Sequence, residues 1–289
     1  MELHGIHVPL VTPFEADGTL AVEALAGLAR QALADGAAGL AALGTTAEVA
    51  TLDEAERRTV IEVCAKAAAE YGATLTVGTG GNDTRRTVAA LAELAGVADA
   101  ALVTVPAFTR PGEAGALAHF EQLAAGSPVP LIVYHIPYRT GQALSAAALR
   151  RIGALPNVAG VKYAAGGIDQ ETIALLADLP PDFAVLAGDD PFLAPLLALG
   201  ATGGILASAH LATARFVEFA EGRGSRELGH RLAQLSIACF AEPNPTVIKG
   251  VLHAQGRIPT PDVRLPLLPA SPESVADALS LLPPSTPTQ

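Results

Sequence analysis

Short runs of consecutive apolar residues alternate with helix-forming segments eight times along the chain, and this alternation constrains the fold most strongly. The runs are 6–11, 39–43, 74–77, 100–105, 129–134, 158–162, 183–187 and 203–206. Strands that are apolar throughout, rather than at every second residue, are typical of parallel sheets buried on both faces. Eight strand–helix units in succession therefore predict an α/β fold, a closed (β/α)8 TIM barrel.

The segments between these runs have helical periodicity, and helices alone follow the last run. We expect barrel helices over 22–34, 53–71, 84–94, from 112 onward, 145–152, 170–177, 191–199 and 212–220. Beyond residue 225 the pattern predicts helices over 227–240, 245–253 and 272–281. The sequence thus predicts a catalytic barrel over 1–224, a helical C-terminal extension over 225–282 and a Pro-rich tail over 283–289 that we expect to be disordered.

Composition excludes several classes of function. The net charge of −11 and the pI near 5.0 argue against a nucleic-acid or anionic-membrane partner, because either would need a basic face. The two cysteines, Cys64 and Cys239, have no metal-ligand spacing, so we expect neither a disulfide nor a metal site. No secretory signal pattern and no run of about 18 apolar residues is present, which predicts a cytoplasmic protein without membrane segments.

Lys162 ends the sixth apolar run in a chain that has three lysines against fifteen arginines. A lysine at the end of a buried strand is costly unless it is paired or neutral, because burial disfavours the ammonium form. A lysine with a lowered pKa offers a free amine, the nucleophile that forms a Schiff base with a carbonyl substrate. The alternative is a structural lysine that extends to solvent or pairs with Asp189 or Asp190.

Polar and small residues gather where the other predicted strands end. In barrels of this kind the chemistry lies at the carboxyl ends of the strands. The candidates there are Thr45, Thr46, Tyr134, Arg139, Gly188 and Ile205. Adjacent hydroxyls can hold a carboxylate, a phenol can relay a proton and an arginine can bind a second carboxylate. Taken singly, each also has a structural explanation. The threonines fit a turn, Tyr134 a core aromatic, Arg139 a surface residue and Gly188-Asp189-Asp190 a helix N-cap.

Four motifs together resemble a known family. They are Gly44-Thr45-Thr46-x-Glu48, Tyr134-x-x-Pro137-x-Arg139-Thr140-Gly141, Gly160-Val161-Lys162 and Gly188-Asp189-Asp190. In order and spacing they are similar to those of the dihydrodipicolinate synthase / N-acetylneuraminate lyase family, the class I Schiff-base pyruvate aldolases and lyases. The resemblance covers nearly the whole chain and is closest to the dihydrodipicolinate synthase branch.

The resemblance implies a role for the residues around pyruvate. Lys162 would form the imine with the keto carbon. Thr45 and Thr46 would hold the pyruvate carboxylate, and Thr46 would also take part in the proton relay. Tyr134 would shuttle protons while the imine and the enamine form. The resemblance thus makes Lys162, Tyr134 and Thr46 the catalytic residues.

The family resemblance also implies which second substrate the protein uses and how its subunits assemble. Arg139 would receive the carboxylate of aspartate semialdehyde, and Gly188 and Ile205 would line the pyruvate site. The partners would be a small keto acid and an aldehyde, with no cofactor beyond the covalent lysine imine and no metal. The implied assembly is a homotetramer, a dimer of dimers.

The chain departs from the synthase pattern after its fourth predicted strand. Ala107-Phe108 stands where synthases carry a Tyr-Tyr pair, whose second tyrosine reaches into the neighbouring subunit's relay. Losing one acid/base group typically costs about 10²–10⁴-fold in rate. The chain is then a slow synthase, or Thr109 or a water replaces the phenol, or the aldehyde differs. Tyr138 and Tyr163 are also not the usual synthase residues.

Three alternatives to the synthase remain open on these residues. The first is an aldolase or dehydratase of a 2-keto-3-deoxy sugar acid or of 4-hydroxy-2-oxoglutarate, which Ala107-Phe108 would favour by opening the pocket. The second is a non-catalytic paralogue that binds a keto acid. The third, a phosphosugar barrel that binds phosphate at Gly203-Gly204, leaves Lys162 without a role.

Overall fold

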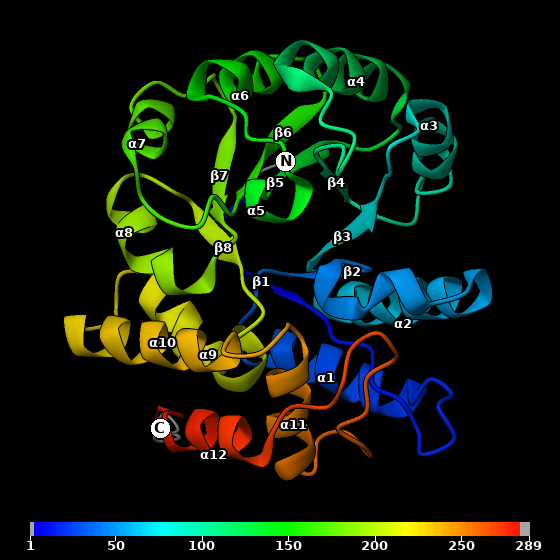
Figure 1. Cartoon of the computed structure of the whole chain (residues 1–289), viewed down its shortest axis with the longest axis vertical. Helices are drawn as coiled ribbons and strands as arrows, with labels where there is room; N and C mark the ends of the chain where they lie inside the picture. The colour runs from blue at the N-terminus through cyan, green and yellow to red at the C-terminus, as the bar shows by residue number, and fades with distance from the viewer. Residues whose placement is uncertain (1–2, 284–289) are drawn as a thin grey trace. The chain divides into compact units, whose positions relative to one another are not determined.

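The eight predicted strands form a closed parallel barrel in sequence order (Figure 1). A computed structural model of the chain describes residues 3–283. The strands are β1 (Gly5–Pro9), β2 (Gly39–Ala42), β3 (Thr74–Thr79), β4 (Ala100–Thr104), β5 (Leu131–His135), β6 (Val158–Tyr163), β7 (Ala184–Ala187) and β8 (Gly203–Ile205). The (β/α)8 fold predicted from the apolar runs is confirmed.

Helices follow the strands as the periodicity predicted. Those of the strand–helix units are α1 (Val22–Ala34), α2 (Glu54–Tyr71), α3 (Thr84–Ala92), α4 (Gly112–Gly126), α6 (Ala146–Gly153), α7 (Gln170–Leu176), α8 (Leu193–Ala198) and α9 (Ala209–Ala220). The C-terminal ones are α10 (Arg226–Cys239), α11 (Thr246–Ala254) and α12 (Pro272–Ser280). Short helical turns, which the periodicity did not predict, are η1 (Thr45–Ala47), η2 (Val49–Thr51), α5 (Pro137–Thr140) and η3 (Asp190–Phe192).

Side-chain caps fix where several helices begin. The Asp53 carboxylate accepts the Glu56 N–H at 2.8 Å, and the Glu56 carboxylate accepts the Asp53 N–H at 2.9 Å, a reciprocal capping box at the start of α2. Asp169 and Thr172 form the same arrangement at α7. Such caps satisfy N–H groups that the helix itself leaves unpaired.

Several predicted boundaries moved by one to three residues, among them those of β5 and α9. The fifth strand, predicted over 129–134, runs instead over Leu131–His135, because Pro130 has no N–H to give to a neighbouring strand. The helix predicted over 212–220 begins earlier, at Ala209, and Ala212 interrupts it with φ −151° and ψ 43°. Element type was therefore predicted better than element ends.

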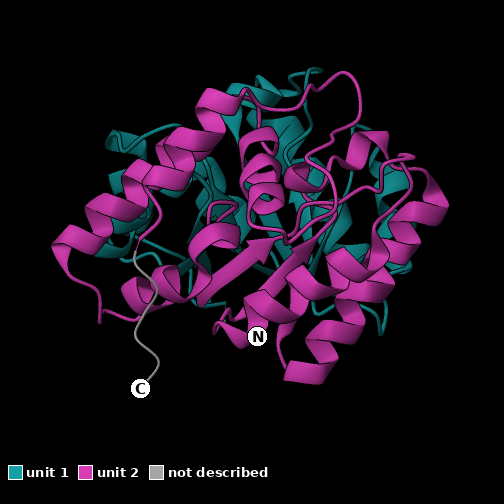
Figure 2. Cartoon of the chain, turned by 90° about the horizontal axis from the view of Figure 1, so that it is seen from below, with its two compact units in different colours: residues 1–4, 76–205 teal, residues 5–75, 206–289 magenta. Residues whose placement is uncertain are grey.

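The described chain forms two compact units (Figure 2). Unit 1 comprises residues 3–4 and 76–205, and unit 2 comprises residues 5–75 and 206–283. The predicted division into a barrel over 1–224 and an extension over 225–282 stays a prediction, and residues 284–289 of the predicted tail lie outside the described residues. Within the described range, none of the helices has the length and hydropathy needed to cross a membrane.

A buried histidine links β1 to α9 within unit 2. His210 is 2% exposed, and its Nε2 accepts the backbone N–H of Val11 at 3.1 Å. Burial first, and then the positive charge of Arg257, lowers the pKa of His210 to about 3, although its contact with the Pro9 carbonyl works in the other direction. The folded protein therefore holds this imidazole neutral.

We predict that His210 makes the protein acid-sensitive below neutral pH. The unfolded chain takes up a proton near pH 6.5, whereas the folded chain does so only near pH 3, so stability falls as pH drops through this window. Between pH 7 and pH 5 the loss from this residue is about 2 kcal/mol. His210→Gln should flatten the pH dependence of urea unfolding, while the exposed control His230→Gln should leave it unchanged. If the free energy of unfolding depended on pH equally in the two variants, His210 would not be the source of the acid sensitivity.

Candidate active site

Strand register brings Lys162 and Tyr134 together in unit 1. Tyr134 on β5 is the direct partner of Lys162 on β6, so the two side chains leave the sheet on the same face. The Lys162 Nζ lies 4.4 Å from the centroid of the Tyr134 ring. Both residues are 6% exposed, so the amine and the phenol share one buried environment.

The next residue of each strand points to the opposite face. The rings of His135 and Tyr163 are 5.5 Å apart, and the Tyr163 hydroxyl lies 3.1 Å from the Thr172 hydroxyl on α7. Burial lowers the pKa of His135 to about 4. Tyr163, one of the residues that differ from the usual synthase pattern, therefore packs against α7, on the face of β6 opposite to Lys162.

A glycine at position 188 leaves room for the lysine. A Cβ there would stand 2.9 Å from the Lys162 Cγ and 3.0 Å from the Ala164 Cβ, closer than side chains tolerate. Ile205, the other predicted lining residue of this unit, is 1% exposed in β8. Gly188 is thus needed for the observed path of the Lys162 side chain.

The structure does not support pairing of Lys162 with Asp189. In the part of the chain that the structure describes, residues 3–283, the Lys162 Nζ forms no salt bridge. The Asp189 carboxylate instead accepts the Tyr138 hydroxyl at 2.8 Å and the Gly166 N–H at 2.7 Å. Asp189 occupies the N-cap position of η3, as the helix-cap interpretation of Gly188-Asp189-Asp190 expected, but its side chain forms no capping hydrogen bond there.

Arg139 lies in α5, the short turn that directly follows β5. Gly141 ends this turn at φ 73°, a conformation that suits glycine, and its N–H bonds to the Pro137 carbonyl at 2.8 Å. Arg139 is exposed, and its neighbour Thr140 is buried. The guanidinium is therefore available to a carboxylate that arrives from solvent.

Phe108 lies in the loop between β4 and α4. It is 91% exposed and has φ 65°, which is rare for a bulky residue. Its N–H bonds to the Thr140 carbonyl at 2.7 Å. The benzyl side chain has no hydroxyl with which to take part in proton transfer.

The predicted threonine pair lies in unit 2, in the turn η1 that follows β2. Thr45 is exposed, whereas Thr46 is 4% exposed and its hydroxyl accepts a hydrogen bond from the Asn244 amide at 2.9 Å. Since Asn244 donates, the Thr46 hydroxyl keeps its own proton available. Sequence reasoning did not find Asn244; the signal it offered was a polar residue before the apolar helix α11.

A buried ion pair holds the next turn. Glu48, at φ 54°, and Lys249 of α11 are 1% and 0% exposed in their side chains, and their charged atoms are 2.8 Å apart. The Lys249 ammonium also donates to the Thr12 carbonyl at 2.9 Å and lies 4.2 Å from the centroid of the Phe14 ring. Burial lowers the pKa of Lys249, and the Glu48 carboxylate opposes that shift.

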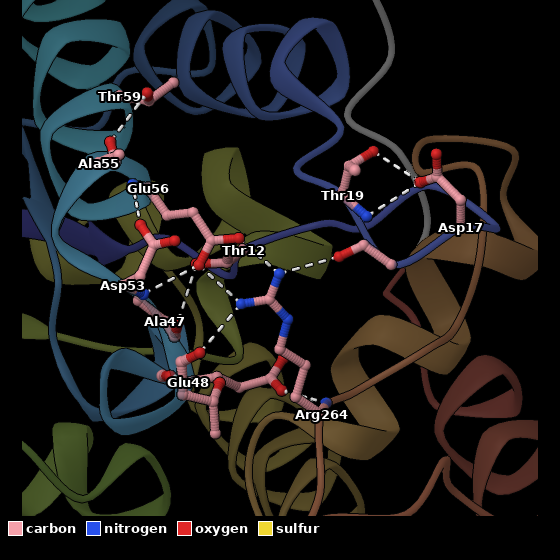
Figure 3. A network of polar contacts seen from close by, with 12 residues as sticks. Thr12, Asp17, Thr19, Ala47, Glu48, Asp53, Ala55, Glu56, Thr59 and Arg264 are labelled. Atoms are coloured by element: carbon pink, nitrogen blue, oxygen red, sulfur yellow. Dashed lines mark hydrogen bonds and ion pairs between the residues drawn. The ribbon is translucent and has the colours of Figure 1, made fainter.

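Arg264 completes this network (Figure 3). Its backbone N–H donates to the second Glu48 oxygen at 2.8 Å, and its guanidinium binds both oxygens of Glu56 at 2.7 and 2.5 Å. Thr12 binds the Ala47 carbonyl at 2.7 Å. These contacts fix the chain on both sides of the turn η1, which carries Thr45 and Thr46. The buried pair therefore helps to position Thr46.

We predict that each half of the buried pair is needed for stability. Glu48→Gln leaves a buried ammonium unpaired and Lys249→Met leaves a buried carboxylate unpaired, so each should lower the free energy of urea unfolding by about 3–5 kcal/mol. The double variant should lose less than the sum. Glu70→Gln, which breaks the exposed Arg30–Glu70 pair, is the matched control and should cost less than about 1 kcal/mol. If Glu48→Gln and Lys249→Met lowered the free energy of unfolding no more than the control does, the buried pair would not be needed for stability.

The geometry can support amine chemistry on a carbonyl. It offers a buried amine that forms no salt bridge within residues 3–283, a phenol ring beside that amine, and an exposed arginine in the turn that follows the phenol's strand. No cluster of three or more metal-ligating side chains occurs among residues 3–283.

Comparisons with known proteins agree with this geometry. The model of the dihydrodipicolinate synthetase family matches residues 2–282. The chain is 34% identical over 278 residues to 4-hydroxy-tetrahydrodipicolinate synthase 2 of Clostridium acetobutylicum, covering 94% of this chain and 96% of that protein.

Solved structures give the same result. A dihydrodipicolinate synthase of Thermotoga maritima superposes with a TM-score of 0.92 at 30% identity over 98% of each chain. A synthase variant described as monomeric superposes with a TM-score of 0.91 at 30% identity, over 97% of this chain and 96% of that one. Because the family model and the curated relative each span nearly all of the sequence, this chain belongs to the dihydrodipicolinate synthetase family.

Proposed function

We propose that the protein is a class I lyase that condenses pyruvate with aspartate semialdehyde, the reaction of a 4-hydroxy-tetrahydrodipicolinate synthase, in lysine biosynthesis. The observation that carries the proposal is the buried Lys162 amine, which lies against the Tyr134 ring and has no salt bridge among the described residues. The relatives that bear this activity in their names span more than nine tenths of the chain.

The chemistry needs a nucleophile and proton transfer. The Lys162 Nζ adds to the keto carbon of pyruvate, and the carbinolamine loses water to give the imine. Tyr134 moves protons between the departing oxygen and the methyl carbon, which loses a proton to form the enamine. Thr46 takes part in this relay, and with Thr45 it holds the pyruvate carboxylate.

The second half of the reaction forms the carbon–carbon bond. The enamine carbon attacks the aldehyde carbon of aspartate semialdehyde, whose oxygen gains a proton. The amino group of that substrate then attacks the imine carbon and releases Lys162 as the free amine. Arg139 binds the carboxylate of the aldehyde substrate, for which its exposed position on α5 is suited. Gly188 and Ile205 line the pyruvate site.

A second candidate keeps the imine and changes the aldehyde. Phe108 favours it, because this residue lacks the hydroxyl of the relay tyrosine and stands 91% exposed. The enzyme would then act on a 2-keto-3-deoxy sugar acid or on 4-hydroxy-2-oxoglutarate. The retention of Lys162, Thr45, Thr46 and Tyr134 together argues against a keto-acid-binding paralogue without activity. Borohydride trapping separates the two, because a binding protein need not form the imine.

The remaining expectations belong to the same proposal. The covalent lysine imine serves in place of a cofactor, and no metal takes part. We infer a cytoplasmic homotetramer, built as a dimer of dimers, because the family resemblance implies this assembly. Mass photometry of the purified protein would separate a tetramer from a monomer.

A panel of aldehydes tests the function directly. We predict turnover of pyruvate with aspartate semialdehyde, at a kcat/KM above that for cleavage of 2-keto-3-deoxy sugar acids. Lys162→Arg should lower turnover by about 10³-fold or more, because a guanidinium stays protonated and cannot form the imine. The matched control Lys66→Arg changes an exposed lysine of α2 and should be neutral. Preferred turnover of the sugar acids would contradict the assignment of the substrate.

A further inference from the structure

Tyr138 connects three loops that follow neighbouring strands of unit 1. It lies on α5 after β5, and its hydroxyl donates to Asp189, which follows β7. Asp189 in turn accepts the N–H of Gly166, from the loop after β6. A Cβ at position 166 would lie 3.7 Å from the Tyr138 ring, so the ring lies beside that same loop. Tyr138, Asp189 and Gly166 form a closed set of contacts, which we call the Tyr138 clasp.

The clasp surrounds the end of the strand that carries Lys162. β6 lies between β5 and β7 in the barrel, and Lys162 is the register partner of Tyr134 on one side and of Leu186 on the other. The loops joined by the clasp are those that directly follow these three strands. The clasp therefore lies at the carboxyl ends of β6, which carries Lys162, and of its two neighbours.

The phenol of Tyr138 is a donor at any physiological pH. Burial raises its pKa, and the Asp189 carboxylate and Tyr134 raise it further, while Arg139 opposes them. The residue nonetheless exposes 58% of its surface, so part of it is open to a substrate that arrives from solvent.

We propose that Tyr138 is a positioning residue that determines which aldehyde the enzyme accepts, a proposal that rests on the proposed function. Its bond to Asp189 fixes the α5 turn and thereby the backbone of Arg139, the neighbouring residue. A fixed arginine recognises a carboxylate at one distance from the reacting carbon. Tyr138 therefore favours a short aldehyde that carries a carboxylate.

The same bond works against polyhydroxylated aldehydes. A carboxylate accepts hydrogen bonds from sugar hydroxyls readily, but both Asp189 oxygens already accept a bond from the protein. The Tyr138 hydroxyl occupies one of the two acceptor sites of Oδ1, so a polyol finds fewer free acceptor sites on Asp189 than it would without that bond. An enzyme often gains specificity when a competing substrate cannot form a hydrogen bond that it needs in the site.

Removal of one hydroxyl tests the proposal. Tyr138→Phe keeps the ring and deletes the bond to Asp189, so we expect the KM for aspartate semialdehyde to rise about five- to tenfold, the range of one net hydrogen bond. The KM for pyruvate should stay within twofold, because Tyr138 acts on the second substrate. The ratio of kcat/KM for a 2-keto-3-deoxy sugar acid to that for aspartate semialdehyde should rise by a similar factor.

Two further variants test whether the effect comes from the bond between Tyr138 and Asp189. Asp189→Ala should change the same constants in the same direction, and the double variant should show less than the product of the two effects, because both substitutions remove the bond between Tyr138 and Asp189. Tyr71→Phe, at the exposed end of α2, is the matched control and should change nothing. An unchanged aldehyde KM and substrate ratio in Tyr138→Phe would overturn the proposal, and so would an equal rise in the KM for pyruvate.

The proposed function can fail separately. If the wild-type protein does not turn over aspartate semialdehyde with pyruvate, the function is wrong whatever Tyr138 does. If the wild type is active and Tyr138→Phe matches it in every constant, only the role of Tyr138 is wrong.

Discussion

The pairing of β5 with β6 is the constraint on which the rest of the site depends. Because side chains alternate across a strand, the register that sets Tyr134 opposite Lys162 puts both on one face and sends His135 and Tyr163 to the other. A shift of one residue on either strand would separate the amine from the phenol. Gly188 supports this arrangement, since any side chain there would collide with the lysine. Backbone pairing, more than any single contact, therefore determines which side chains lie beside the Lys162 amine.

Two of the three lysines are buried, and they differ in the groups that surround their side-chain nitrogen atoms. Lys249 is fully buried, but Glu48, the Thr12 carbonyl and the face of Phe14 surround its ammonium group, so its charge is compensated and its role is structural. Lys162 is nearly as buried and has no salt bridge in the described part of the chain. A buried amine without a counter-charge has no evident structural benefit. That contrast is the physical reason to regard Lys162 as the nucleophile.

Most of the fold could be predicted from sequence, because it depends on local apolar runs and caps. The eight strands and the helices that follow them were visible as patterns of apolar residues. Contacts between distant residues were not: the Glu48–Lys249 pair joins residues 201 positions apart, and Asn244 reaches Thr46 across 198. Lys249 was noticed only as one of three lysines, although a charged residue inside the apolar segment of α11 was the available signal. The bond from Tyr138 to Asp189 likewise needs the strand order before it can be foreseen.

The central claim is that Lys162 captures a keto acid as an imine. Incubation of the protein with pyruvate and borohydride, followed by proteolysis and peptide mass analysis, tests it most directly. Loss of water on imine formation and gain of two hydrogens on reduction should leave the Lys162 peptide heavier by pyruvic acid less one oxygen atom, with the Lys66 and Lys249 peptides unmodified. An unmodified Lys162 peptide, or equal labelling of all three lysines, would contradict the account.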